Sequence, residues 1–137
     1  MIIVSACLAG LHCRYDGGEK SCKGVIHLVM EGKAIPVCPE QLGGLATPRM
    51  PAEIIGNKVI TKDGIDVTGE FNKGAQEALQ LAKLVVARKA ILKANSPSCG
   101  SGKIYDGSFS GTLVDGDGVT ADLFKKNDIE VKTEEEI

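Results

Sequence analysis

The stretch AILKANSPSCG, residues 90–100, joins a short apolar run to a stiff loop of small residues that contains one cysteine. The apolar part has the length of a buried β-strand, and the Pro, Ser and Gly residues after it are typical of a tight loop. Two other stretches have the same form, since Cys7 follows the apolar run Met1–Val4 and Cys38 follows Ala34–Val37. The sequence thus places a cysteine just after each of three predicted strands.

Helical periodicity alternates with these strands. Apolar residues recur three and four apart from Gly69 to Arg88, with Thr68 as the expected N-cap, and the same spacing predicts a shorter helix from Ser21 to Glu31. A hairpin is expected around Gly56, between Ile54 and Ile60, and short β segments in the glycine-rich stretch 105–118. The remaining expected elements are strands Ile2–Ala6, Ala34–Val37, Ala90–Lys93 and Ile129–Val131, a helix from Thr120 to Lys126, and a frayed tail, VKTEEEI.

This alternation predicts an α/β fold: a single layered domain over residues 1–137, with a mainly parallel sheet flanked by helices. In open α/β sheets, sites form beyond the carboxyl ends of the strands. Because Cys7, Cys38 and Cys99 each follow a strand, we expect their thiols to meet in one crevice if the three strands are neighbours.

Composition narrows the possible functions. The chain has 137 residues, 43% of them hydrophobic and 25% charged, with a formal net charge of −2. This balance argues against binding long nucleic acid through phosphate neutralisation. No run of 18 apolar residues predicts a membrane span, and the N-terminus lacks the basic start of a signal peptide. Five cysteines without an export signal favour reduced thiols and a cytoplasmic location.

Several chemistries could use these cysteines. Free cysteine often packs as a small apolar side chain, but here the thiols adjoin Pro, Gly, Ser and charged residues. A phosphatase-like loop needs five residues between cysteine and arginine, whereas six separate Cys7 from Arg14. The sequence contains neither a Cys-x-x-Cys pair nor a paired histidine spacing, so its pattern does not indicate a zinc site. The Cys38-Pro39 pair weakly favours an iron–sulfur cluster. The residues alone thus predict a thiolate metal site on an α/β domain.

Six motifs together resemble the thiouracil desulfidase family over nearly the whole chain: SACLAGLHCRYDG, PVCPEQLGGLATPRMPAEI, DVTGEF, LKANSPSCG, IYDGSFSG and GDGVTADLF. The resemblance implies a [4Fe-4S] cluster held by three cysteines, with one iron open, and removal of sulfur from a 2-thiouracil-type base without net redox change. It also implies that tRNA thiouridine is a possible substrate. The candidate ligands are Cys7, Cys13, Cys38 and Cys99. Their positions at strand ends favour Cys7, Cys38 and Cys99, with Cys13 as the alternative.

Two further residues are candidates for catalysis. Glu40 follows Cys38 closely and is expected to activate the attacking water, and Ser96 to orient the reacting groups before hydrosulfide is released. A cluster with an open iron is expected to be sensitive to oxygen. The alternative is a non-catalytic iron–sulfur or metal-binding sensor, which would not need Glu40 or Ser96. Arg14, Tyr15, Asp16 and Arg49 lie in the nearest loops, where they either hold the base or organise the loops.

Overall fold

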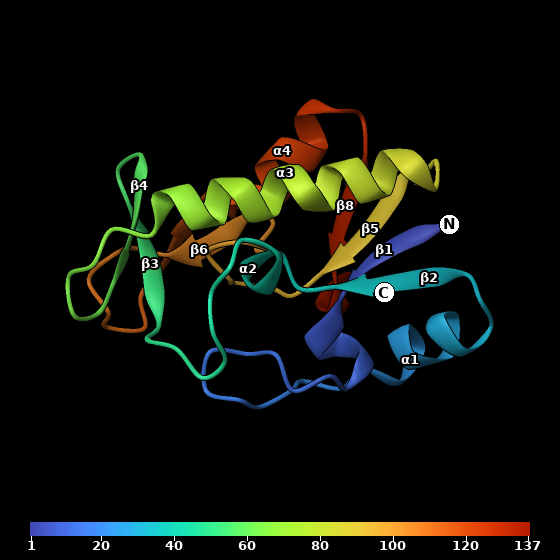
Figure 1. Ribbon diagram of the computed structural model, residues 1–137, viewed down its shortest axis with the longest axis horizontal. Helices are drawn as coiled ribbons and strands as arrows, with labels where there is room; N and C mark the ends of the chain where they lie inside the picture. The colour runs from blue at the N-terminus through green and yellow to red at the C-terminus, as the bar shows by residue number, and fades with distance from the viewer.

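A four-stranded parallel sheet forms the centre of the computed structural model, which covers residues 1–137 (Figure 1). Its strands lie in the order β2 (Ala34–Val37), β1 (Ile2–Ser5), β5 (Lys89–Leu92) and β8 (Glu130–Thr133). All three strand pairs are parallel. The predicted α/β fold with a parallel sheet flanked by helices is therefore confirmed. No helix combines the length and the apolar character that crossing a membrane requires.

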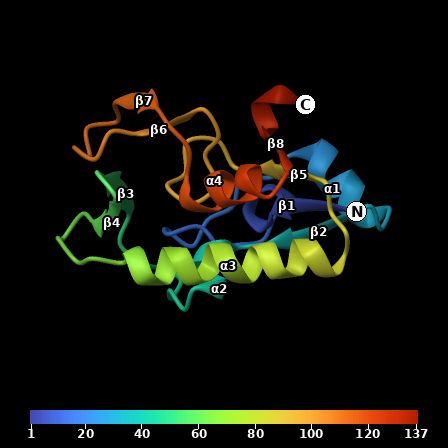
Figure 2. The same ribbon diagram turned by 90° about the horizontal axis from the view of Figure 1, so that it is seen from above.

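Helices cover both faces of this sheet (Figures 1 and 2). On one face α3 (Thr68–Leu84) and α4 (Val119–Lys126) pack over a core that includes Ile3, and on the other α1 (Lys23–Met30) packs over a core that includes Val4. Successive residues of a strand point to opposite faces, so a strand covered on both sides must be apolar throughout. This explains the apolar runs at β1, β2 and β5, whereas the edge strand β8 carries Glu130 and Lys132.

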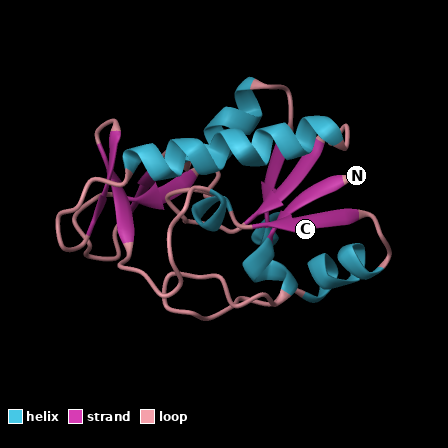
Figure 3. Cartoon of the chain, in the orientation of Figure 1, coloured by secondary structure: helices cyan, strands magenta, loops and turns pink.

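Two antiparallel hairpins stand beside the sheet, at the end of α3 where that helix begins (Figure 3). One is formed by β3 (Ala52–Ile55) and β4 (Lys58–Thr61), and the other by β6 (Lys103–Tyr105) and β7 (Leu113–Asp115). A carboxylate oxygen of Glu53 accepts hydrogen bonds from the backbone N–H groups of Gly107 and Phe109, at 2.9 and 3.1 Å. This buried carboxylate links the two hairpins. The sequence predicts the first as a hairpin, and for the second only short β segments within 105–118.

The predicted helix ends are partly wrong. The N-caps are Cys22, Val67 and Gly118, instead of Ser21, Thr68 and Thr120, and none accepts a capping hydrogen bond through its side chain. The Thr68 hydroxyl accepts instead from the N–H group of Val59, and the Thr120 hydroxyl is bonded to that of Ser98. Both hydroxyls thus form hydrogen bonds with distant segments of the chain instead of capping their own helices. The long helix ends at Leu84, before the left-handed backbone of Val86 (φ 54°).

Three short elements depart from expectation. Strand β1 ends at Ser5, and the chain continues as the 3-10 helix η1 (Ala6–Ala9). Residues Pro39–Leu42 form the short helix α2, where the sequence predicted no helix. The C-terminal tail is not frayed, because Thr133 caps a final turn, η2 (Glu134–Glu136), in which Glu136 completes a capping box.

Candidate active site

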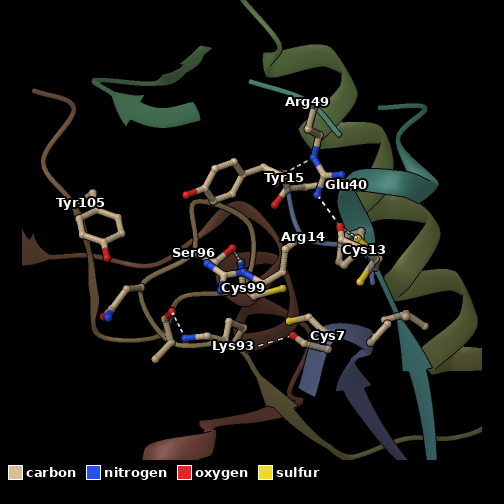
Figure 4. Close-up of a pocket in the computed structure, with 17 residues that line it drawn as sticks. Cys7, Cys13, Arg14, Tyr15, Glu40, Arg49, Lys93, Ser96, Cys99 and Tyr105 are labelled. Carbon is tan, nitrogen blue, oxygen red and sulfur yellow. Dashed lines mark hydrogen bonds and ion pairs between the residues drawn. The ribbon is translucent and has the colours of Figure 1, made fainter. Parts of the chain in front are cut away.

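A cavity of about 140 Å³ lies beyond the carboxyl ends of β1, β2 and β5 (Figure 4). It is partly open to solvent and is lined by both apolar and charged groups. The cavity is lined by these residues with reactive, charged or hydrogen-bonding side chains: Cys7, Cys13, Cys38, Cys99, Glu40, Ser96, Arg14, Tyr15, Arg49, Lys93, Asn95 and Tyr105.

Four of the five free cysteines line this one cavity. Cys7 lies in η1 directly after β1, Cys38 between β2 and α2, and Cys99 in the loop after β5, while Cys13 comes from the loop after η1. The Cys38 sulfur lies 3.8 Å from the carbonyl oxygen of Cys13. Nowhere do three or more Cys, His, Asp or Glu side chains form a group fit for a metal ion. What the four cysteines share is the cavity that they line.

Burial shifts the pKa values of two of these thiols, and a hydrogen bond between thiols shifts those of the other two. Desolvation raises the pKa of Cys7 to about 11 and that of Cys99 to about 12. A hydrogen bond from the Cys13 thiol lowers the pKa of Cys38 to about 7, and the same bond raises the pKa of Cys13. Cys7 and Cys99 are thus protonated at neutral pH unless a metal takes the place of the proton.

The loop that carries Cys99 is held by the Ser96 hydroxyl. The Ser96 oxygen accepts hydrogen bonds from the backbone N–H groups of Ser98 and Cys99, each at 3.1 Å. The Ser98 hydroxyl is in turn 2.9 Å from that of Thr120 at the start of α4. The preceding residue, Asn95, has a left-handed backbone (φ 68°), a conformation that Asn tolerates better than most residues.

Glu40 reaches the cavity because α2 packs very closely on α3. The contact has glycine on both sides: a Cβ atom on Gly74 would lie 1.8 Å from the Pro39 carbonyl oxygen, and one on Gly43 would lie 2.0 Å from that of Glu70. This close approach fixes α2, whose first turn carries Glu40. The Glu40 carboxylate is 19% exposed and forms an ion pair with Arg49 at 3.1 Å.

Other charged groups differ in how they relate to the cavity. The Arg14 guanidinium lies 5.7 Å from the centre of the Tyr15 ring, and both residues line the cavity. Asp16 does not line it, because its carboxylate accepts from the N–H group of Gly18 and closes a turn. The sequence allowed Asp16 either to hold a ligand or to organise its loop, and the structure shows the second role.

Lys93, Asn95 and Tyr105 also line the cavity, although the sequence did not single them out. Lys93 pairs with Glu134 of the tail at 2.9 Å, and Glu134 also accepts from the N–H group of Ala94 at 2.7 Å. Lys93 and Asn95 lie at and just after the end of the predicted strand 90–93, so the argument that sites form at strand ends could have identified them. Glu134 had no such signal, because it is close to β5 only in the folded chain.

The fold and cavity define an α/β protein with a thiol-lined site at the carboxyl edge of a parallel sheet. The chain belongs to the 2-thiouracil desulfurase family, whose sequence model matches residues 2–136. It is 48% identical to the uncharacterized protein YbbK of Bacillus subtilis, over 100% of this chain and 97% of that protein. It is also similar to the solved structure of the [4Fe-4S]-dependent thiouracil desulfidase TudS, with a TM-score of 0.95 and 48% identity, over 99% of this chain and 91% of the other.

Proposed function

We propose that this protein is a [4Fe-4S]-dependent desulfidase that removes sulfur from 2-thiouracil-type bases by a hydrolytic reaction. The observation that carries the proposal is one cavity lined by four cysteine thiols, a carboxylate and a hydroxyl. Family membership and the likeness to the thiouracil desulfidase TudS support the same activity.

The donor set fits an iron–sulfur cluster. Cluster ligands are cysteine thiolates, and each binds a different iron, so the sulfurs surround a volume instead of meeting at one point. The proposed ligands Cys7, Cys38 and Cys99 follow three adjacent strands and line one cavity, with Cys13 as the alternative ligand. When bound, the cluster would supply a Lewis-acidic iron that is soft enough to polarise a thione C–S bond.

Glu40 is proposed to act as the general base. One carboxylate oxygen, Oε1, accepts from Arg49, while Oε2 makes no hydrogen bond in the structure. Oε2 can therefore accept a proton from a water that attacks the thione carbon. A C–O bond forms and the C–S bond breaks, so thione and water yield the oxo-base and hydrogen sulfide, released as hydrosulfide. No atom changes its oxidation state in this exchange.

Ser96 is proposed to act as a hydrogen-bond donor. Its oxygen already accepts from two backbone N–H groups, those of Ser98 and Cys99, which occupy both lone pairs. The hydroxyl proton is left to donate to the base or to the attacking water. The same two bonds fix the side chain, so this donor is oriented before a ligand arrives.

The proposed substrate is a small thionucleobase. The cavity of about 140 Å³ would hold the cluster and the ligand together, which favours a small ligand, and the net charge of −2 does not favour binding long nucleic acid. A thiouridine in tRNA is the larger substrate to compare, because a nucleotide would need to extend out of the open side of the cavity.

The test is an anaerobic assay on reconstituted protein. Iron and acid-labile sulfide are measured per chain, and conversion of 2-thiouracil to uracil is followed together with hydrosulfide release. A chain loaded with about four irons and four sulfides should convert the thione. A loaded chain that leaves 2-thiouracil, its nucleoside and thiolated tRNA unchanged would favour a sensor and refute the desulfidase function.

Two variants test the role of the base. Glu40→Gln should keep its iron and lose nearly all turnover, since the amide cannot accept the proton. The matched control is Glu77→Gln on the exposed side of α3, which should behave as the unmodified protein. A fully active Glu40→Gln protein would show that another group activates the water.

A further inference from the structure

Arg49 is almost fully buried beside the active-site cavity, with its side chain only 9% exposed. Its guanidinium donates to three different segments of the chain. Nη2 donates to the carbonyl oxygen of Cys13 at 2.9 Å, Nε donates to Glu40 Oε1 at 3.1 Å, and Nη1 donates to Thr47 Oγ1 at 2.8 Å and to the Ala46 carbonyl at 3.2 Å.

The backbone of Arg49 adds a further link to the same region. Its N–H group donates to the carbonyl oxygen of Tyr15 at 2.8 Å. Arg49 therefore contacts the Cys13–Tyr15 loop twice and the helix that carries Glu40 once. No other residue hydrogen-bonds to both the cysteine loop and the Glu40 carboxylate.

These contacts leave Arg49 little capacity to bind a ligand itself. A guanidinium has five N–H groups, and four of them point at protein acceptors here. Arg14, in contrast, donates no side-chain hydrogen bond and faces the same cavity. A bidentate contact with a bound base or anion is therefore open to Arg14 and closed to Arg49.

The contact with Glu40 determines which carboxylate oxygen is available. Because Arg49 holds Oε1, the unpartnered Oε2 is the oxygen left to face the cavity, and rotation of the carboxylate would break the ion pair. The planar fork of arginine can hold the carboxylate and the Cys13 carbonyl at once. A lysine ammonium, which is a single point of charge, lacks the geometry to reproduce both contacts.

We propose that Arg49 is a positioning residue of the desulfidase reaction: it holds Glu40 with Oε2 toward the cavity and keeps the Cys13 loop in register with α2. This inference rests on the proposed function, because it assigns Arg49 a role through the general base. Because four of its five N–H groups bond to protein acceptors, Arg49 is assigned a role through Glu40 instead of a direct contact with the substrate. Its effect is on the distance and direction between the base and the thiol-lined floor of the cavity.

The test is a double-mutant cycle on iron-loaded protein with Arg49→Lys, Glu40→Gln and their combination. Arg49→Lys should lower kcat by about 10- to 100-fold, since a displacement of about 1 Å can cost about 100-fold. KM should stay within about threefold, and iron and sulfide per chain should equal those of the unmodified protein. In the Glu40→Gln background, Arg49→Lys should lower kcat no further, because the two residues act as one unit.

The control is Arg88→Lys, an exposed arginine without an ion pair, which should change nothing. If Glu40→Gln has no measurable turnover, the cycle is performed with Glu40→Asp, whose carboxylate is one methylene shorter. The inference is overturned if the two effects on kcat multiply, if Arg49→Lys keeps full kcat, or if its kcat falls only in proportion to lost iron. An inactive, iron-loaded unmodified protein would instead refute the proposed function, so the two failures are distinguishable.

Discussion

Replacing Gly74 by alanine should displace α2 and with it Glu40. Gly74 lies where α3 meets α2, and an added Cβ atom would be 1.8 Å from the carbonyl oxygen of Pro39. The contact is reciprocal, since a Cβ on Gly43 would meet the Glu70 carbonyl. Both obstacles are backbone atoms, so no side-chain rotation relieves the clash and the short helix must move as a unit.

The size of the movement follows from the contact distance. An ordinary contact of 3.4 Å requires the Pro39 oxygen to retreat by about 1.6 Å from its position at 1.8 Å. Forcing an extra methyl into a packed interface costs about 1–3 kcal/mol of folding free energy. A displacement of about 1 Å at a catalytic group can reduce the rate about 100-fold. We therefore expect Gly74→Ala to lose most of its turnover while remaining folded.

The assay compares Gly74→Ala with Gly69→Ala, which lies on the same helix and has open space around an added Cβ. Alanine is the better helix former by about 1 kcal/mol, so Gly69→Ala should be as stable as the unmodified protein or more stable. Urea midpoints report stability, and iron-normalised turnover reports the position of Glu40. If Gly74→Ala matches Gly69→Ala in both measurements, the close helix contact does not position the base.

Three further substitutions test the loops around the site. Ser96→Ala leaves the N–H groups of Ser98 and Cys99 without their acceptor, which should cost about 1–3 kcal/mol and lower the iron retained per chain. Val86→Gly should raise the free energy of unfolding by about 0.5–1 kcal/mol without changing turnover. The left-handed backbone costs a residue with a side chain about 1–2 kcal/mol, and glycine removes that cost. Glycine also makes the unfolded chain more flexible, which offsets about 0.5–1 kcal/mol of the gain. Glu134→Ala should speed hydrogen exchange at the N–H group of Ala94, which loses its acceptor. Glu134→Gln keeps an acceptor and loses only the ion pair with Lys93, so it should lower the free energy of unfolding by less than about 1 kcal/mol.

Three strands of the sheet, β1, β2 and β5, were predictable from sequence because they appear as short apolar runs, whereas the edge strand β8 is the mixed sequence EVKT. Val4 and Ile91 are apolar for one face, and Ile3 and Leu92 for the other. The gathering of cysteines at one edge followed from the same argument. Helix ends were less predictable, since the Thr68 hydroxyl bonds to the neighbouring hairpin and not to its own helix.

The features that sequence could not predict depend on contacts between distant segments. Helix α2 has four residues, too few for periodicity, and it is held by its glycine contact with α3. Arg49 lies between two prolines in a loop, and only the fold shows that its guanidinium reaches Glu40 and Cys13. The acidic tail likewise resembles a solvated end until Glu134 is seen beside β5.

The pairing of β1 with both β2 and β5 has a consequence for how the protein is made. Ile2 is adjacent to Ala34 on one side and to Lys89 on the other, so β1 can complete its pairing only after β5, much later in the chain, has been synthesised. At synthesis rates of about 5–20 residues per second, the roughly 60 residues from Cys38 to Cys99 take about 3–12 s to appear. During those seconds the early thiols are exposed on a nascent chain without the edge that encloses them. The four thiols can therefore share one cavity only after the chain has been synthesised beyond Cys99.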